Sequence, residues 1–184
     1  MYSLQDENVH NVVVDGGFDD CQDLVKRLAE DAEYKRSFSL GAMNSINLGR
    51  ISAQIAYYVW AWLRASDDVA ASERAGFEVS FAVPSGNFGN ILSGLYAKLM
   101  GVPVRRLVLA VNENDVLDEF FRSGVYRPRP AAETFATSSP SMDVSRASNL
   151  ERFVFELLGR DAEGTAALWT DLQVDGMFDL TAQQ

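Results

Sequence analysis

The chain has 184 residues, 47% of them hydrophobic and 23% charged, which is an ordinary composition for a folded domain with a substantial core. The formal net charge of −10 argues against a surface for nucleic acid or an anionic membrane, because such surfaces need clustered Lys and Arg. No uninterrupted apolar run reaches the roughly 18 residues that a membrane-spanning helix needs. We therefore expect neither a nucleic-acid partner nor a membrane partner.

The scarcity of cysteine and histidine limits the chemistry that the chain can support. The single cysteine, Cys21, excludes an internal disulfide and suits a reducing compartment. The single histidine, His10, excludes the usual metal sites built from several histidines, so we predict no metal site. Residues 1–8 are acidic and polar, unlike a secretory signal or a transit peptide. These features predict a cytoplasmic protein.

The first forty residues predict one strand and one helix. Residues 10–14 (His-Asn-Val-Val-Val) are typical of a short buried strand, which would end at the Asp-Gly-Gly of residues 15–17. An acidic helix is expected over residues 19–31, and its inward-facing side chains would be Cys21, Leu24, Val25 and Leu28. At that place Cys21 is interpreted as a small core residue rather than a nucleophile.

A polar stretch at residues 40–50 leads into a long helix that is expected to reach about Ser66. Its apolar side chains recur at steps of three and four: Leu48, Ile51, Ile55, Val59 and Trp62. Other apolar residues lie on the remaining sides, which predicts a helix buried between layers. Asn47 or Ser45 is the expected N-cap. Arg50 would then be a charge inside a buried helix, and such an arginine needs either a carboxylate or an anionic ligand.

Residues 77–111 predict a strand, a helix and a second strand, which together form a βαβ unit. Apolar and polar or small residues alternate over 77–83, as in a strand, and leucines recur at helical spacing over 92–99. Gly101 and then Pro103 end that helix. Residues 106–111 are almost continuously apolar, as expected for a strand inside a parallel sheet.

The turn between this strand and this helix is rich in glycine and small polar residues: Ser85, Gly86, Asn87, Phe88, Gly89 and Asn90. A strand that turns into a helix presents unpaired backbone N–H groups beside the positive end of the helix dipole, which together attract an anion. The turn lacks the Gly-Lys-Ser/Thr ending of a P-loop and the third glycine of a dinucleotide site. It therefore suits a single phosphate monoester, such as that of pyridoxal phosphate or flavin mononucleotide. A structural turn without a ligand is an alternative of equal weight on spacing alone.

The remainder of the chain predicts mainly helices. A short helix is expected over residues 114–123, with Phe120 and Phe121 inward and Gly124 as its stop. An extended segment at 126–130 and a polar stretch at 134–143 follow. Residues 148–151 fit a capping box that begins one helix, and Asp161 caps another. No strand is expected near residue 177 or beyond. The pattern of strands and helices along the chain predicts the fold class α/β, a parallel sheet flanked by helices.

Four motifs in order give a resemblance to a known family. Residues 83–90 closely resemble the pyridoxal-phosphate phosphate loop of threonine synthase. Residues 18–26, residues 44–54 and residues 139–144 with 148–152 are similar to three further segments of that family. The resemblance covers about residues 10–180. It implies a partial fold-type II pyridoxal-phosphate architecture, similar to the tryptophan synthase β chain, with residues 1–184 as a central segment of the large domain and 77–111 as its phosphate cradle.

The resemblance also implies a reaction and a site. The family is a pyridoxal-phosphate lyase that acts on a carbon–oxygen bond of a phosphate ester and converts O-phosphohomoserine and water into threonine and phosphate. The residues implied to bind the cofactor are Ser85, Gly86, Asn87, Phe88, Gly89 and Asn90. Those implied to bind the substrate phosphate are Asn44, Ser45 and Arg50, which would give Arg50 its anionic partner. Leu48-Gly49 stand where the family usually shows Trp-Ala, a difference that bears on the shape of the pocket.

The family's Schiff-base lysine has no counterpart in this chain. That lysine lies in a Phe-Lys-Asp context upstream of the four motifs, and Lys26, Lys35 and Lys98 all lack this context. Lys98 lies about three turns into the helix after the loop, about 12–18 Å from the helix start. The family's C-terminal hydroxyl partner of the pyridine nitrogen is also absent. We therefore assign no catalytic residue and expect a central fragment of a synthase that is inactive alone.

Two other hypotheses come from different functional classes. The chain could be a non-catalytic α/β module that binds phosphate or pyridoxal phosphate, or a degenerate structural or regulatory domain without affinity for phosphate. Missing flanking segments would leave apolar faces near the long helix uncovered. We therefore expect the isolated chain to self-associate.

Overall fold

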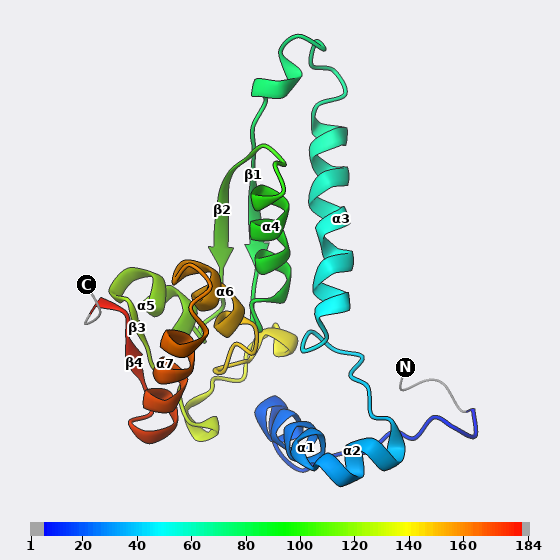
Figure 1. The fold of residues 1–184 in the computed structure, drawn as a ribbon, viewed down its shortest axis with the longest axis vertical. Helices are drawn as coiled ribbons and strands as arrows, with labels where there is room; N and C mark the ends of the chain where they lie inside the picture. The colour runs from blue at the N-terminus through cyan, green and yellow to red at the C-terminus, as the bar shows by residue number, and fades with distance from the viewer. Residues whose placement is uncertain (1–5, 182–184) are drawn as a thin grey trace. The chain divides into compact units, whose positions relative to one another are not determined.

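The computed structural model describes residues 6–181 and divides the chain into two compact units, Met1–Leu40 and Gly41–Gln184 (Figure 1). The first unit contains helix α1 (Phe18–Glu30) and helix α2 (Ala32–Phe38). Asp31 separates them, and its carboxylate accepts hydrogen bonds from the backbone N–H groups of Glu33 and Tyr34 at 3.0 and 2.9 Å. The predicted acidic helix is thus confirmed as α1.

Two predictions in this unit are wrong. Residues 10–14 form no strand, and Val12 and Val13 are 83% and 95% exposed. A strand needs a neighbour to pair its backbone groups, and the described part of this unit contains none. The apolar side chains of α1 that were expected inward, Cys21, Leu24, Val25 and Leu28, are exposed because this two-helix unit offers no layer for them to pack against.

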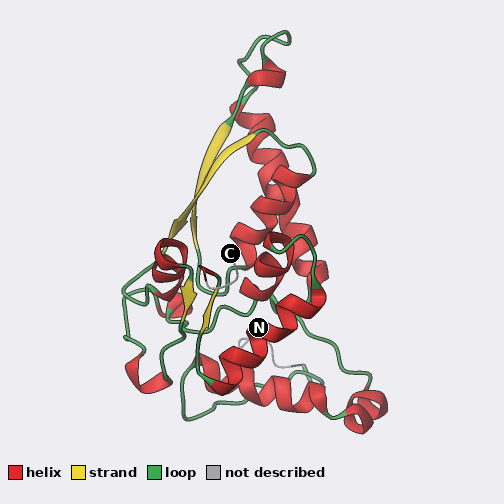
Figure 2. Cartoon of the chain, turned by 60° about the vertical axis from the view of Figure 1, so that its left-hand side comes forward, coloured by secondary structure: helices red, strands yellow, loops and turns green. Residues whose placement is uncertain are grey.

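The second unit begins with helix α3 (Leu48–Ala65), strand β1 (Val79–Pro84), helix α4 (Gly89–Leu99) and strand β2 (Val104–Ala110). It continues with helix α5 (Val116–Ser123), strand β3 (Val125–Tyr126), helices α6 (Leu150–Leu157) and α7 (Ala162–Val174), and strand β4 (Phe178–Asp179). Short 3-10 helices lie at Arg74–Gly76, Ala131–Glu133 and Pro140–Met142. Figure 2 shows that helices outweigh strands.

The predicted strand–helix–strand unit is confirmed. β1 and β2 pair in parallel, with Phe81 opposite Leu107 and Val83 opposite Leu109. α4 connects them and packs on one side against the sheet and on the other against α3, as Figure 1 shows. The first strand ends at Pro84, so the glycine-rich turn lies at the carboxyl edge of the sheet, where the helix begins.

α3 packs through one face only, contrary to the prediction that it is buried between layers. Ile51 and Tyr58 are buried against α4, whereas Leu48, Tyr57 and Trp60 are more than half exposed. The apolar residues on its other sides have no second layer to cover them in the described part of the chain. Asn47 is confirmed as the N-cap, since its side chain accepts from the N–H of Gly49 at 2.9 Å.

The contact between α3 and α4 depends on a glycine. A Cβ atom added to Gly94 would lie 2.7 Å from the ring of Tyr58 and 2.9 Å from Leu107. The Tyr58 hydroxyl donates to the carbonyl and the side-chain oxygen of Asn90, both at 2.9 Å. Burial raises the pKa of Tyr58 to about 12. The ring is therefore held at both its body and its hydroxyl, and α4 can approach it only through Gly94.

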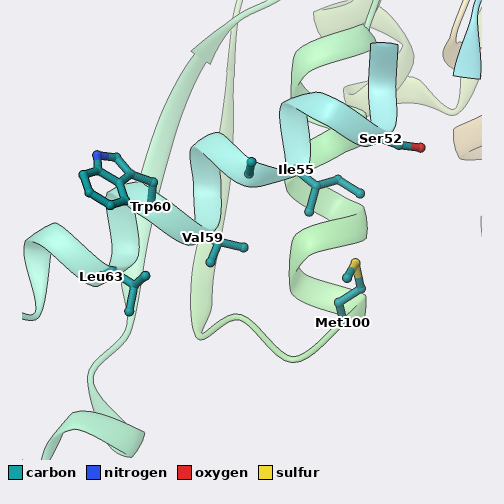
Figure 3. Close-up of a pocket in the computed structure, with 7 residues that line it drawn as sticks. Ser52, Ile55, Val59, Trp60, Leu63 and Met100 are labelled. Atoms are coloured by element: carbon teal, nitrogen blue, oxygen red, sulfur yellow. The ribbon is translucent and has the colours of Figure 1, made fainter. Parts of the chain in front are cut away.

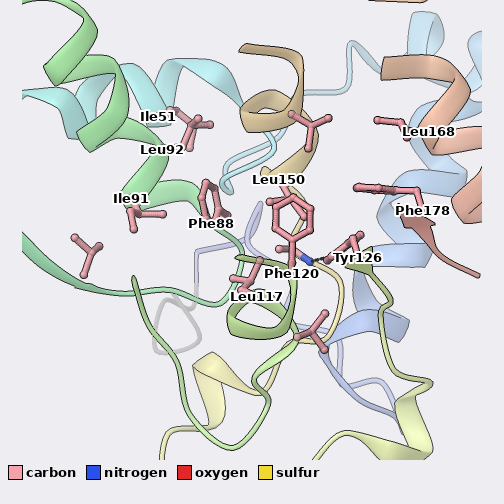
Figure 4. Packing of buried hydrophobic residues seen from close by; sticks show 14 of the residues in the cluster. Ile51, Phe88, Ile91, Leu92, Leu117, Phe120, Tyr126, Leu150, Leu168 and Phe178 are labelled. Carbon is pink, nitrogen blue, oxygen red and sulfur yellow. Dashed lines mark hydrogen bonds between the residues drawn. The ribbon is translucent and has the colours of Figure 1, made fainter. Parts of the chain in front are cut away.

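A second group of helices surrounds an aromatic core at the carboxyl end of the chain. Phe120 of α5, Tyr126 of β3 and Phe178 of β4 contact one another with ring centroids 5.3 to 6.0 Å apart (Figure 4). Gly124, at φ 78°, ends α5 as predicted. Phe120 is buried as expected, but Phe121 is 48% exposed.

Strand β4 was not expected. Phe178 pairs with Tyr126 and Asp179 with Val125, in antiparallel register. Each of these strands has two residues, too few to show the alternation by which a strand is recognised in sequence. The pair forms because it brings Phe178 onto the aromatic core.

We predict that Gly94→Ala destabilises the chain by about 1 to 2 kcal/mol, because overpacking against the anchored ring of Tyr58 outweighs the better helix propensity of alanine. Urea denaturation followed by circular dichroism measures this change. Gly76→Ala is the matched control, because a Cβ there meets no atom within 4 Å. Equal stability of the two variants would contradict the packing argument.

Candidate functional site

The turn after β1 leaves a run of backbone N–H groups without protein partners. The N–H of Ser85 donates to Ala110 at 2.9 Å, and the first hydrogen bond inside α4 runs from Leu92 to Phe88 at 3.1 Å. Between them, the N–H groups of residues 86–91 donate to no acceptor in the described part of the chain. The positive end of the α4 dipole lies at the same place. This arrangement favours a bound anion, and a phosphate monoester matches its several donors.

Phe88 gives the turn its shape. It has left-handed backbone angles (φ 64°, ψ 6°), which cost a residue other than glycine about 1 kcal/mol or more. Its ring is only 3% exposed and contacts the rings of Phe121 and Phe153 at centroid distances of 5.9 and 5.4 Å. Burial of the ring offsets the backbone cost, so Phe88 contributes its backbone, and not its side chain, to the surface of the turn.

The two glycines of the turn allow other loops to approach closely. A Cβ atom on Gly89 would lie 3.2 Å from the Ile51 side chain and 3.3 Å from Cβ of Ser45. On Gly86 it would lie 3.5 Å from Cα of Met142. Two polar motifs that are distant in sequence, residues 44–50 and residues 139–144, therefore lie against the cradle, here meaning residues 85–90.

Asn149 and Ser148 tie the start of α6 to the cradle. The backbone carbonyl of Asn87 accepts from both the N–H and the side-chain amide of Asn149, each at 3.1 Å. The Ser148 hydroxyl donates to the side-chain oxygen of Asn87 at 3.2 Å. The predicted capping box is thus wrong in detail: Asn149 occupies the N-cap position without a side-chain cap bond. Both side chains serve the cradle instead of the helix end.

The side chains of Asn90 and Ser85 form hydrogen bonds within the protein and are not available to a ligand. The Asn90 amide donates to Gln54 Oε1 at 2.9 Å, and its oxygen accepts from Tyr58. The Ser85 hydroxyl donates to the carbonyl of Val83 at 3.3 Å, and the residue is buried. Of these two predicted cofactor residues, Asn90 can offer only its backbone N–H, and Ser85 anchors the loop to the sheet.

The loop before α3 carries Asn44 and Ser45, and Arg50 lies in the first turn of α3; of these, Ser45 lies against Gly89 of the cradle. The Asn44 side chain accepts from the N–H of Ile46 at 3.0 Å, and so it shapes its own loop. Arg50 is exposed rather than buried, and its guanidinium donates to the carbonyl of Met43. No carboxylate within residues 6–181 forms an ion pair with Arg50. Its positive charge is therefore available to an anion, although the inference that burial demands one is wrong.

Arg152 is a residue of the site that sequence reasoning missed. From the first turn of α6 it donates to the carbonyl of Ile46 at 2.7 Å, to that of Ser45 at 3.4 Å, and to the side-chain oxygen of Asn149. It joins two loops about a hundred residues apart in sequence. In the sequence, its only signal is a place in the motif at residues 148–152.

Asp143 holds the second polar motif in shape. Its carboxylate accepts from the N–H and hydroxyl of Thr137 at 2.9 and 2.7 Å, and from the amide of Asn112 at 2.8 Å. These hydrogen bonds, those of Thr137 above all, hold the pKa of Asp143 below its ordinary value. The carboxylate stays ionised and fixes the turn that carries Met142 and Val144 against Gly86.

Lys98 is the only lysine of the second unit, which contains no histidine and no cysteine. Lys98 lies at the opposite end of α4, where its ammonium donates to the carbonyl of Arg105 at 3.3 Å. Within residues 6–181 no group of His, Cys, Asp and Glu side chains is arranged to hold a metal ion. No helix among them is long and apolar enough to cross a membrane. The cradle is thus a candidate anion site, and the lysine on its own helix lies at that helix's far end.

No known protein-family profile matches this chain. Individual proteins do. The threonine synthase of Methylobacillus glycogenes is 54% identical over 180 residues, which are 98% of this chain and 37% of that protein. The threonine synthase of Corynebacterium glutamicum is 52% identical over 98% of this chain and 36% of its own length. The chain thus spans just over a third of the length of these relatives.

The solved structures that resemble this chain are also threonine synthases. The threonine synthase of Brucella melitensis, determined with bound pyridoxal phosphate, superposes with a TM-score of 0.78 at 42% identity over 94% of this chain and 35% of that one. Yeast threonine synthase superposes with a TM-score of 0.77 at 37% identity over 96% of this chain and 35% of its own. By sequence and by fold, this chain is therefore homologous to just over a third of threonine synthase, a fold-type II pyridoxal-phosphate enzyme.

Proposed function

We propose that this chain provides the phosphate-binding half of a pyridoxal-phosphate site, together with part of a substrate-phosphate site, in a threonine synthase. The observation that carries the proposal is the run of N–H groups at residues 86–91, which have no acceptor among residues 6–181 and lie at the start of α4. The cradle fits the cofactor's phosphate because Gly86 and Gly89 have no side chains to fill it. The absence of these side chains also allows the neighbouring loops to approach. The Brucella homologue, with pyridoxal phosphate bound, supports the choice of cofactor.

The residues of this chain would bind and orient the cofactor and the substrate, and none of them would take part in the chemical step. Backbone donors of Gly86, Asn87, Phe88, Gly89 and Asn90 would grip the cofactor phosphate, while buried Ser85 anchors their loop. When bound, pyridoxal phosphate supplies the electron sink that elimination and water addition on an amino acid require. Asn44, Ser45 and Arg50 would hold the phosphate of O-phosphohomoserine. Arg50 suits this role because it is exposed and faces no carboxylate in the described chain.

Conversion of O-phosphohomoserine and water into threonine and phosphate is proposed for the whole protein, not for this chain acting alone. Lys26, Lys35 and Lys98 all lack the Phe-Lys-Asp context of the family's Schiff-base lysine, and Lys98 lies at the far end of α4 from the cradle. We expect the isolated 184-residue chain to be inactive. A cytoplasmic location is part of the proposal, supported by the single cysteine, which suits a reducing compartment.

The same observations support a second reading of the isolated chain as a non-catalytic module. Its cradle can bind a phosphate monoester although no catalytic group accompanies it. Binding of pyridoxal phosphate without turnover favours this module for the isolated chain. A complete lack of affinity favours a degenerate structural domain instead.

We predict that the chain binds pyridoxal phosphate and that Gly86→Val reduces the affinity at least tenfold, because the larger side chain would crowd the cradle and push against Met142. Equilibrium dialysis measures the binding. Gly76→Val, at a position where a Cβ meets no atom within 4 Å, should bind like the parent. Equal affinities for both variants would contradict the placement of the phosphate.

We predict that Arg50→Met weakens binding of 2-amino-5-phosphonopentanoate, the phosphonate with the shape of O-phosphohomoserine, by about tenfold or more. The reason is the loss of a charge-assisted contact to the phosphonate, worth about 1.5 to 3 kcal/mol. Calorimetric titration of the chain saturated with pyridoxal phosphate measures the affinity. Arg64→Met, at the other end of α3, is the matched control and should leave it unchanged. If both substitutions have the same effect, Arg50 has no specific role.

We also propose that the uncovered face of α3 associates with a second copy of the chain. Apolar side chains of α3 and Met100 line an open groove of about 470 Å³ (Figure 3). Of its lining residues, Trp60 is 61% and Met100 is 71% exposed. The helix has 18 residues, a length of about 27 Å, so two copies can place this stripe against itself in one symmetric contact.

Sedimentation velocity at tens of micromolar should therefore show dimers or larger species, and Trp60→Glu should shift the chain toward monomer by placing a charge in the contact. Ala53→Glu is the control, since Ala53 is on the same helix but does not line the groove. A monomeric parent chain would overturn this part of the proposal.

A further inference from the structure

We infer that Asn149 and Arg152 are positioning residues that couple the cradle to the loop that carries Asn44 and Ser45. A ligand bound at one of these two loops would then change the conformation of the other. The inference rests on the proposed function of these two loops. It adds to the site the N-cap residue of α6 and one residue of its first turn, neither of which is proposed to touch a ligand. Both act through the backbone groups that they hold.

Asn149 sets the direction of one peptide of the cradle. It is fully buried, and two of its donors converge on the carbonyl of Asn87 at 3.1 Å each. In a trans peptide the carbonyl and the following N–H point in opposite directions. With the Asn87 carbonyl held toward the start of α6, the N–H of Phe88 is aimed away from α6. That N–H is among the unpaired donors of residues 86–91. Asn149 therefore orients a donor that it does not contact.

Arg152 extends this link to the other loop. One helical turn after Asn149, its guanidinium donates to the side-chain oxygen of Asn149 and to the carbonyls of Ser45 and Ile46. No carboxylate within residues 6–181 forms an ion pair with it, so its fork of donors serves these neutral oxygens. A guanidinium is planar, and its donors keep a fixed angle to each other. Movement of Asn149 is therefore passed to the loop that carries Asn44 and Ser45.

A direct route between the loops also exists, which makes the role of Arg152 testable. Gly89 lies against Ser45, and a Cβ on that glycine would be 3.3 Å from Cβ of Ser45. If van der Waals contact alone connected the loops, removal of the guanidinium would leave their coupling intact. If Arg152 were merely structural, its loss would lower the stability of the chain. The change that ligand binding at one loop causes in the other loop would then stay the same.

The test follows backbone amides of the 184-residue chain by nuclear magnetic resonance during titration with pyridoxal phosphate. In the parent chain we expect shifts of the amides of residues 86–91 and also of Ser45 and Ile46. In Arg152→Met the first group should still shift, while the shifts of Ser45 and Ile46 are lost. Arg152→Lys keeps the charge without the fork and should restore them in part. Arg122→Met, which removes an exposed arginine paired with Asp118, should behave like the parent.

Shifts of Ser45 and Ile46 that persist in Arg152→Met would overturn the inference while leaving the cradle assignment intact. If residues 86–91 do not respond in the parent chain, the proposed cofactor site fails. The link is then judged without ligand, by whether Asn149→Ala moves the amides of Ser45 and Ile46 and whether Arg152→Met abolishes that effect. If Arg152→Met does not fold, Arg152→Lys takes its place, and the question is whether it reduces the effect of Asn149→Ala on the amides of Ser45 and Ile46. Independent effects of the two substitutions would overturn the coupling.

Discussion

The site depends on backbone donors that the fold leaves without partners. Unpaired N–H groups at the start of a helix are costly when nothing accepts from them, and a loop that presents several would ordinarily rearrange to satisfy them. Here the rearrangement is blocked from several sides. Ser85 is hydrogen-bonded to β2, the ring of Phe88 is buried, and the carbonyl of Asn87 is held twice by Asn149. The donors of residues 86–91 remain free because their neighbours are fixed.

Polar groups, together with the buried ring of Phe88, carry this rigidity across the site. Asn149 is fully buried, and its amide and its N–H both bind the cradle. Asp143 accepts three short hydrogen bonds from Thr137 and Asn112, which keep its carboxylate ionised and its turn closed against Gly86. A satisfied polar network has one geometry, whereas an apolar core tolerates several. This is a physical reason for surrounding the proposed anion site with asparagine side chains rather than leucine.

Elsewhere in the molecule, apolar side chains remain exposed. α3 covers α4 with one face and exposes Tyr57 and Trp60 on the other. The apolar face of α1 is likewise exposed within its own two-helix unit. The homologues are nearly three times as long as the matched segment, so their remaining length offers surfaces that this chain lacks. The well-ordered polar site and the uncovered apolar faces thus occur in the same molecule for different reasons.

The local features of the fold could be predicted from the residues alone. Alternation over β1, leucine spacing over α4, the glycine stop at Gly124 and the Asn47 cap follow from backbone geometry within a few residues. The shape of the turn that we propose as an anion cradle was predictable for the same reason, since a strand, a glycine turn and a helix are neighbours in sequence. Three other features depend on contacts between distant segments: α3 is half exposed, residues 10–14 find no strand partner among the described residues, and Phe178 pairs with Tyr126. Arg152 belongs to this second group, because its partners lie about a hundred residues away and no periodicity reaches that far.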